Sequence, residues 1–338
     1  MKYVTRDDCP SLAIGATLLG SGGGGDPEYD CLRTQQLIDQ HGAIRVVQVE
    51  ELHDDALVVP VGFMGAPLVS IEKLPSGKEY TAIFQSIERV FGKKIDALVA
   101  LEIGGSNAFA PLLAAGGTEI AVVDGDMIGR AFPQLEMSSG NLFNIDIHPA
   151  FIADSFGNVL ELRCKTSVEA EKYFRALCSA MGSTAAVSMY IMTGKEAKRA
   201  LIRSTLSRAC KLGRREEAYC HNKIASGIVT DMEQKIDDGF LRGKIVVEGE
   251  SGSITIDFQN EYLAVFKGQR MCAATPDIIA ILDAETLLPL SVEQVKFGLQ
   301  VVVISLDCDP LWKTEQGLLL VGPEAFGLEA FGYMRGGV

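Results

Sequence analysis

Apolar and polar positions in the first half of the chain alternate between short runs of strand length and longer amphipathic stretches of helix length. This alternation is typical of parallel strands joined by helices that cover the faces of one sheet. The predicted strands cover residues 43–49, 56–61, 97–101 and 119–123, and the predicted helices cover residues 10–19, 27–41, 80–91 and 107–115. The first half therefore predicts a three-layer α/β domain with a mainly parallel sheet.

After about residue 165 the pattern shifts towards short strands. Two helices come first, over residues 167–181 and from the Thr193 capping box to about Leu212. Alternating runs such as SITIDF then recur between turn residues, which favours a sandwich or a barrel. The predicted strands cover residues 244–248, 253–258 and 261–266, with further runs near Ile278, Val301 and Leu318.

The length of 338 residues suits two domains. We predict an α/β domain over residues 1–163 that carries the active site, and a β-rich, barrel-like domain over residues 164–338 with helical segments near 167–212.

The net charge indicates which classes of partner suit the protein, and the cysteine content indicates its compartment. The net charge is −13, and the first 160 residues hold 10 lysines and arginines against 21 aspartates and glutamates. Part of this excess is an acidic, solvated surface, and it disfavours nucleic acid and anionic membranes as partners. The eight cysteines form no CxxC pair, and no apolar run reaches the length of a membrane span. We expect a cytoplasmic protein without a signal peptide.

Polar and glycine residues follow directly after three of the predicted strands. In open α/β sheets the ligand crevice lies outside the carboxyl ends of the strands. We therefore expect Glu102, Asn107, Asp124 and Asp126 to meet at one edge of the sheet. The two aspartates flank a single glycine, and such a repelling pair suits a cation site or acid–base chemistry. The alternative is that these are turn glycines and that Ser106 or Asn107 caps the next helix.

The glycine-rich loop GSGGGG at 20–25 precedes a helix that Asp26 would cap. Glycine amides at a helix N-terminus can hold an anion, but neither GK[ST] nor a strand–GxGxxG–helix unit is present, so we expect no nucleotide. The loop is interpreted either as backbone that approaches a substrate or as a tight structural turn. Arg130 is a candidate clamp for a substrate carboxylate. Its alternative is an ion pair with Asp124, Asp126 or Glu136.

Several segments together resemble the S-methyl thiohydantoin desulfurase family. They are GSGGGGDP, VGFMGAP, IEKLPSGKEY, LEIGGSNAFAPLLAAGG and VVDGDMIGRAFPQLEM in the first half, and MTGKEAKRALI, FQNEYLAV, PDIIAILDAETLLPL and VGPEAFG in the second. The resemblance covers essentially the whole chain. It implies a three-layer α/β domain, a barrel-like second domain and hydrolytic removal of sulfur from a thiohydantoin ring. Members of this family are similar to neighbours or fusion partners of hydantoinase-type enzymes.

The hypothesis that follows is attack of water on the ring carbon that bears sulfur. We expect Asp124 or Asp126 to activate the water, with Glu102 as a third catalytic carboxylate. Glu72 and Glu102 could complete a divalent metal site with the two aspartates. The predicted contacts of the small heterocyclic substrate are Ser21, Gly23, Gly24, Asp26, Gly65, Asn107 and Arg130.

Two alternatives remain open from the sequence. The chain could be a non-catalytic subunit of a hydantoinase-type complex, or it could bind phosphate or a nucleotide through the glycine-rich loop. We also expect a homo-oligomer.

Overall fold

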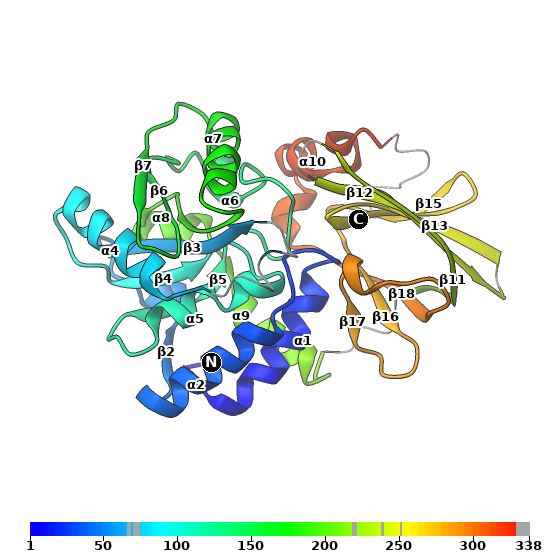
Figure 1. The fold of residues 1–338 in the computed structure, drawn as a ribbon, viewed down its shortest axis with the longest axis horizontal. Coiled ribbons are helices and arrows are strands. Elements are labelled where there is room, and N and C mark those ends of the chain that lie inside the picture. The colour runs from blue at the N-terminus through cyan, green and yellow to red at the C-terminus, as the bar shows by residue number, and fades with distance from the viewer. Residues whose placement is uncertain (66–68, 70–74, 218–221, 238–239, 251, 329–338) are drawn as a thin grey trace.

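Two sheets with their connecting helices form two lobes that lie side by side (Figure 1). The computed structural model describes residues 1–65, 69, 75–217, 222–237, 240–250 and 252–328. The first lobe contains a ten-stranded sheet and most of the helices, and the second lobe contains an eight-stranded sheet. In the described part of the chain, no helix combines the length and the apolar character needed to cross a membrane.

The sheet of the first lobe is mixed, with a parallel centre. Its strands follow the order β1-β2-β5-β4-β3-β8-β6-β7, with β9 paired to β3 and β10 paired to β5. The parallel centre consists of β2 (Ile44–Val47), β5 (Ala121–Asp126), β4 (Ala97–Ala100) and β3 (Leu57–Gly65). The antiparallel additions are β1 (Tyr3–Val4), β6 (Ala150–Ala153), β7 (Val159–Leu162), β8 (Thr184–Ser188), β9 (Met192–Thr193) and β10 (Ile202–Arg203).

Helices cover both faces of this sheet. Val58 and Val59 of β3 belong to different hydrophobic cores, because successive strand residues point to opposite faces. One core includes side chains of α1 (Cys9–Leu19), α2 (Glu28–His41), α4 (Lys78–Phe91), α5 (Ala110–Ala115) and α9 (Thr205–Gly213). The other includes side chains of α7 (Ser167–Ala180) and α8 (Gly194–Ala200), near the short helix α6 (Ser139–Leu142). The layers agree with the α/β prediction.

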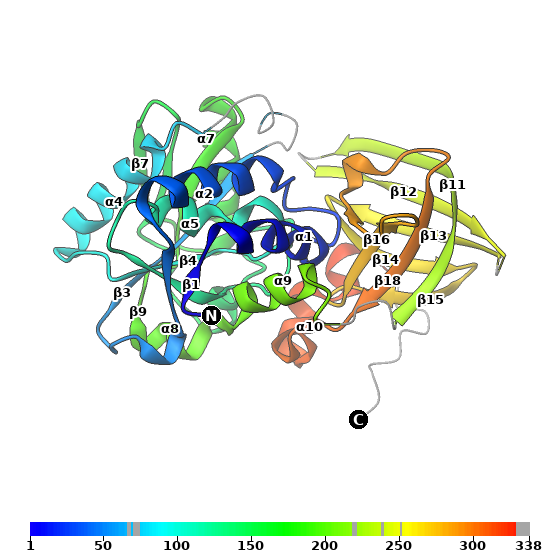
Figure 2. The same ribbon diagram turned by 90° about the horizontal axis from the view of Figure 1, so that it is seen from below.

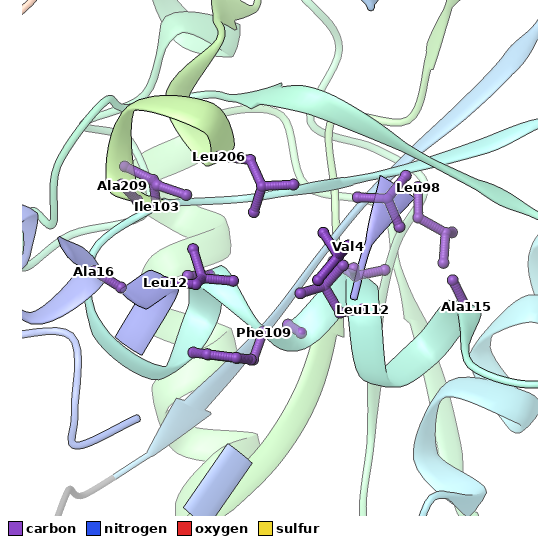
Figure 3. Close-up of a cluster of buried hydrophobic side chains, with 14 of the residues drawn as sticks. Val4, Leu12, Ala16, Leu98, Ile103, Phe109, Leu112, Ala115, Leu206 and Ala209 are labelled. Carbon is purple, nitrogen blue, oxygen red and sulfur yellow. The ribbon is translucent and has the colours of Figure 1, made fainter. Parts of the chain in front are cut away.

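Helices α1 and α9 meet beside the parallel centre of the sheet. Leu12 of α1, Leu206 of α9 and Phe109 before α5 lie around one cluster of buried side chains (Figure 3). The contact continues into the second lobe, because the same core includes Ile278 and Ala280 of β16. The two lobes therefore share an apolar core.

The second lobe is one antiparallel sheet. Its order is β15-β14-β13-β12-β11-β18-β16-β17. The strands are β11 (Lys223–Asp237), β12 (Phe240–Gly249), β13 (Gly252–Gln259), β14 (Glu261–Lys267), β15 (Arg270–Ala274), β16 (Ile278–Asp283), β17 (Pro289–Leu290) and β18 (Gln300–Leu306). Over the described residues the pairing ends at β15 and β17, so the predicted barrel is not closed.

The glycine-rich loop of the first lobe enters the seam where such a barrel would close. The backbone carbonyl of Ser21 accepts a hydrogen bond from Tyr262 N of β14, at 2.6 Å. The Ser21 hydroxyl donates to Ile279 O of β16 at 2.8 Å and accepts from Ile279 N at 3.1 Å. Ser21 thus bonds to both strands at this position, which explains why β14 and β16 remain unpaired.

Two predicted elements differ from the structure. The helix expected from Thr193 to about Leu212 is two helices, α8 and α9, because β10 between them pairs with the end of β5. The run near Leu318, expected to be a strand, lies in helix α10 (Glu315–Val321), whose N-cap residue Thr314 accepts from Gly317 N at 3.1 Å. The elements from α7 to α9 pack on or pair with the first sheet, although the predicted domain boundary precedes them.

Short 3₁₀ helices lie between several of these elements. They are η1 (Arg6–Asp8), η2 (Val49–Glu51), η3 (Gly105–Ala108), η5 (Val292–Gln294), η6 (Pro310–Lys313) and η7 (Pro323–Phe326).

The Thr193 capping box gives a stability prediction. Thr193 Oγ1 accepts from Glu196 N at 3.3 Å, and a Glu196 carboxylate oxygen accepts from Thr193 N at 2.8 Å. We expect Thr193→Ala to lower the free energy of unfolding by about 1 kcal/mol, because one amide at the start of α8 loses its acceptor. Urea denaturation measures the change. Thr81→Ala, at an exposed position of α4, is the control, and equal losses in the two variants would contradict the capping role.

Candidate active site

Charged side chains from both lobes gather where the glycine-rich loop meets the second sheet. We define the interlobe site as Glu102, Asn107, Asp126, Arg130 and Glu261. Glu102 follows β4, Asp126 ends β5 and Glu261 begins β14. Glu102, Asn107 and Asp126 were predicted from the ends of the parallel strands and Arg130 as a clamp for a carboxylate, whereas Glu261 was not predicted. Burial perturbs the pKa values of all three acids, which is typical of functional sites.

Asp126 is a buried carboxylate that organises the loops around it. Its Oδ2 accepts hydrogen bonds from the amides of Ile103 at 2.8 Å, Ile128 at 3.1 Å and Gly129 at 2.7 Å. Burial raises its pKa to about 7, although the three amides act in the opposite direction. Asp126 therefore holds the loop after β4 against the segment after β5, which sets the place of Glu102.

Glu102 is the acid of this site that is half-buried as a residue, whereas Asp126 and Glu261 are fully buried. Its Oε1 accepts from Asn107 Nδ2 at 2.7 Å, and the backbone of Phe132 also donates to it. Burial raises the pKa of Glu102 to about 7, with a further contribution from Asp126, while the Asn107 hydrogen bond lowers it. The carboxyl group therefore changes protonation near neutral pH.

Asn107 does not act as the helix cap that was its alternative. Its Oδ1 accepts from Phe63 N at 2.6 Å, and its Nδ2 also donates to Phe63 O at 3.2 Å. The same amide group thereby ties the end of β3 to Glu102. This arrangement fixes the orientation of the Glu102 carboxylate.

Arg130 is fully buried and is held mainly by backbone carbonyls. Its Nε donates to Ala131 O at 2.9 Å, and its Nη1 donates to Pro276 O at 2.9 Å and Asp277 O at 2.7 Å. Its guanidinium carbon lies 4.7 Å from the centre of the Phe132 ring. Within the described ranges, Nη2 has no hydrogen-bond partner, and none of the three carboxylates named as alternatives forms an ion pair with it.

Glu261 is contributed by the second lobe. Its side chain is 3 % exposed, and Oε2 has no hydrogen-bond partner among the residues that the structure describes. Burial raises its pKa well above the ordinary value, with a further contribution from Glu102, while Arg130 acts in the opposite direction. One signal in the sequence was an acid directly before the apolar run YLAV, within the family-like segment FQNEYLAV.

The glycine-rich loop owes its composition to close contacts with its neighbours. A Cβ on Gly22 would lie 2.6 Å from the Tyr262 ring, one on Gly23 would lie 2.2 Å from Glu261 Oε1, and one on Gly24 would lie 2.6 Å from Gly104 O. These contacts support the tight-turn interpretation. The loop also places its backbone directly against the interlobe site.

Three predicted contacts lie around or outside this loop. Ser21 uses its hydroxyl between β14 and β16, as described above. Asp26 is exposed, and its Oδ1 accepts from Glu28 N at the start of α2, at 2.9 Å. Gly65 is at the end of β3, where an added Cβ would lie 2.4 Å from Ser183 O. None of these three contacts involves Glu102 or Arg130.

Asp124 is separated from the interlobe site. Its carboxylate accepts from Ser207 N at 3.0 Å and from Gln48 Nε2 at 3.2 Å, and it also accepts from the Ser207 hydroxyl. The carboxylate is 1 % exposed. Asp124 therefore attaches α9 to the sheet. It does not lie beside the loop amides that Asp126 binds.

The three described residues among the four ligands predicted for a divalent metal do not form one group. Asp124 faces α9, Asp126 is bound by three amides, and Glu72 lies outside the described residues. Over the described ranges, no group of three or more His, Cys, Asp or Glu side chains is arranged to hold a metal ion. The donor set does not fit the predicted site.

Comparison with known proteins identifies the family. A model described as the S-Me-THD-like N-terminal domain matches residues 7–163, and a model described as the S-Me-THD-like C-terminal domain matches residues 165–334. The X-ray structure of a protein from Chromobacterium violaceum, a Northeast Structural Genomics Consortium target, has a TM-score of 0.79 and 25% identity over 98% of both chains. No curated protein matches the sequence. The chain belongs to the S-methyl thiohydantoin desulfurase family.

Proposed function

We propose that the protein hydrolyses an S-methyl thiohydantoin or a related heterocycle, so that water replaces sulfur at the ring carbon. Family membership supports desulfurase chemistry. The hydrolytic step rests on one observation, which is that the half-buried residue Glu102, at the junction of the two lobes, has a pKa of about 7. A base with such a pKa can accept a proton from water near neutral pH.

Glu102 is a better base than either aspartate that the sequence suggested. Asp124 is buried against α9, and Asp126 uses one oxygen to bind three amides. Glu102 is held by Asn107 and is the half-buried acid of the site, so it is the carboxylate best placed to meet a water molecule. Asp126 then acts as a positioning residue, because it holds the amide of Ile103 next to Glu102.

The remaining groups supply charge and hydrogen bonds. Burial lowers the pKa of Arg130 to about 10, so the side chain stays protonated near neutral pH and can bind an anionic group of the substrate. In the described structure, the amides of Gly24 and Gly25 donate to no protein acceptor. These amides are available to stabilise negative charge that develops on the ring as water attacks.

A substrate panel tests this proposal. The purified protein is incubated with S-methyl thiohydantoins, unsubstituted thiohydantoins and the corresponding hydantoins, and released methanethiol or sulfide is measured. We expect methanethiol and the hydantoin in equal amounts from the S-methyl compounds. A parallel series with a chelator shows whether the reaction requires a divalent metal.

Three outcomes would contradict the proposal. Release of no thiol or sulfide from any compound would exclude desulfurisation by the protein alone. Thiol release without formation of the hydantoin would exclude hydrolysis. Hydantoin ring opening without loss of sulfur would likewise replace the proposed reaction with a hydantoinase reaction.

A further inference from the structure

We propose that Glu261 of the second lobe is a second catalytic residue, the general acid that protonates the departing sulfur. This inference rests on the function proposed above and assigns to the second lobe a direct part in the reaction. Its basis is geometric, because Glu261 is brought to the interlobe site by the same contacts that join the lobes.

The glycine-rich loop fixes Glu261 beside the first lobe. Tyr262 N, the next amide of β14, donates to Ser21 O at 2.6 Å, and the Tyr262 ring packs against Gly22. The Glu261 side chain lies against Gly23, where even a methyl group would collide with its carboxylate at 2.2 Å. Glu261 is therefore held in place by the backbone of the loop.

Three buried polar atoms of the interlobe site lack partners among the described residues, and one of them is Oδ1 of Asp126. Glu261 Oε2 and Arg130 Nη2 make no hydrogen bond to any described residue, although the two side chains are 3 % and 0 % exposed. Buried polar groups are nearly always paired, because an unpaired one carries its full desolvation cost. A polar ligand bound between the lobes would provide the missing partner for the Glu261 and Arg130 atoms.

The two glutamates are suited to opposite roles. Glu102 titrates near neutral pH, whereas burial and the neighbouring Glu102 keep Glu261 protonated to higher pH. Two carboxyl groups whose surroundings separate their pKa values form an acid–base pair. Glu102 accepts a proton from water, and Glu261 carries the proton that a thiolate leaving group requires.

The proton balance of this reaction closes. The oxygen of water bonds to the ring carbon while one water proton passes to Glu102. The carbon–sulfur bond breaks, its electron pair moves to sulfur, and sulfur takes the proton of Glu261 to leave as methanethiol. The second water proton passes to the ring nitrogen as the hydantoin carbonyl forms. Proton exchange from Glu102 to Glu261 restores the starting state.

The test compares two leaving groups in Glu261→Gln. An S-methyl thiohydantoin releases a poorly leaving thiolate that needs a proton, whereas an S-(4-nitrophenyl) thiohydantoin releases a stabilised thiolate that does not. We expect Glu261→Gln to lower kcat about 100-fold or more for the S-methyl compound. The loss for the nitrophenyl compound should be at most about 5-fold, since the remaining steps are unchanged. Glu293→Gln, an exposed acid near Glu261, is the matched control.

If Glu261→Gln does not fold, the dependence of wild-type kcat/KM on the acidity of the leaving thiol tests the same role. With a general acid, kcat/KM changes little across thiohydantoins whose leaving thiols differ in acidity, and without one it rises steeply as the thiol becomes more acidic. A steep dependence would overturn the role of Glu261, as would equal losses of Glu261→Gln on both substrates. Wild-type protein that releases thiol from neither substrate would instead overturn the proposed function itself.

Discussion

Replacing Glu102 with glutamine is expected to lower kcat by a factor of about 100 to 10,000 while the fold is retained. The amide keeps the shape of the side chain and can still hydrogen-bond to Asn107, but it cannot accept a proton from water. Methanethiol release under saturating substrate measures the loss. Glu161→Gln, at an exposed position of β7, is the control for removal of a carboxylate, and it should keep wild-type activity. Activity of Glu102→Gln within twofold of the wild type would contradict the role of Glu102 as the base.

The pH profile gives the same prediction a second readout. The pKa of Glu102 is raised to about 7, and a base works in its deprotonated form, so wild-type kcat/KM should rise with pH through about 7. This rise should be absent from the residual activity of Glu102→Gln. Burial also raises the pKa of Asp126 to about 7, so either acid could cause this rise in kcat/KM. The variant Asp126→Asn shows which of the two acids causes it. The rise should persist in Asp126→Asn, at lower activity, if Asp126 only positions the loop.

The site in the first lobe was predictable because strand ends in a parallel sheet meet at one edge. Glu102, Asn107 and Asp126 are brought together as this rule requires. Asp124 was placed with them because it directly follows a predicted parallel strand, one glycine before Asp126. The register between β4 and β5 shifts after Leu98, so that Asp126 stands opposite Ala100, and this irregularity separates the two aspartates.

The part of the site from the second lobe depends on tertiary contacts that no local pattern describes. Glu261 lies near Arg130 because Ser21 joins β14 to β16. The hydrogen bond between Ser21 and Tyr262 of β14 spans 241 residues of sequence. The same contact leaves the predicted barrel open. Strand and helix positions follow from periodicity, but the place where one lobe enters the sheet of the other does not.

Gly15→Ala is expected to destabilise the protein by about 3 kcal/mol, although helix propensity alone predicts a gain of about 1 kcal/mol. An added Cβ would lie 1.8 Å from Ala209 O of α9, and the reciprocal contact is as close, with Gly213 against Ser11 O at 1.8 Å. Backbone must therefore move at the crossing of α1 and α9, beside the loop that reaches the interlobe site. Urea denaturation measures the change, with Ser11→Ala as the control for a small substitution in the same helix. Gly213→Ala should shift stability in the same direction, and a gain in stability from Gly15→Ala would show that the two helices can separate at low cost.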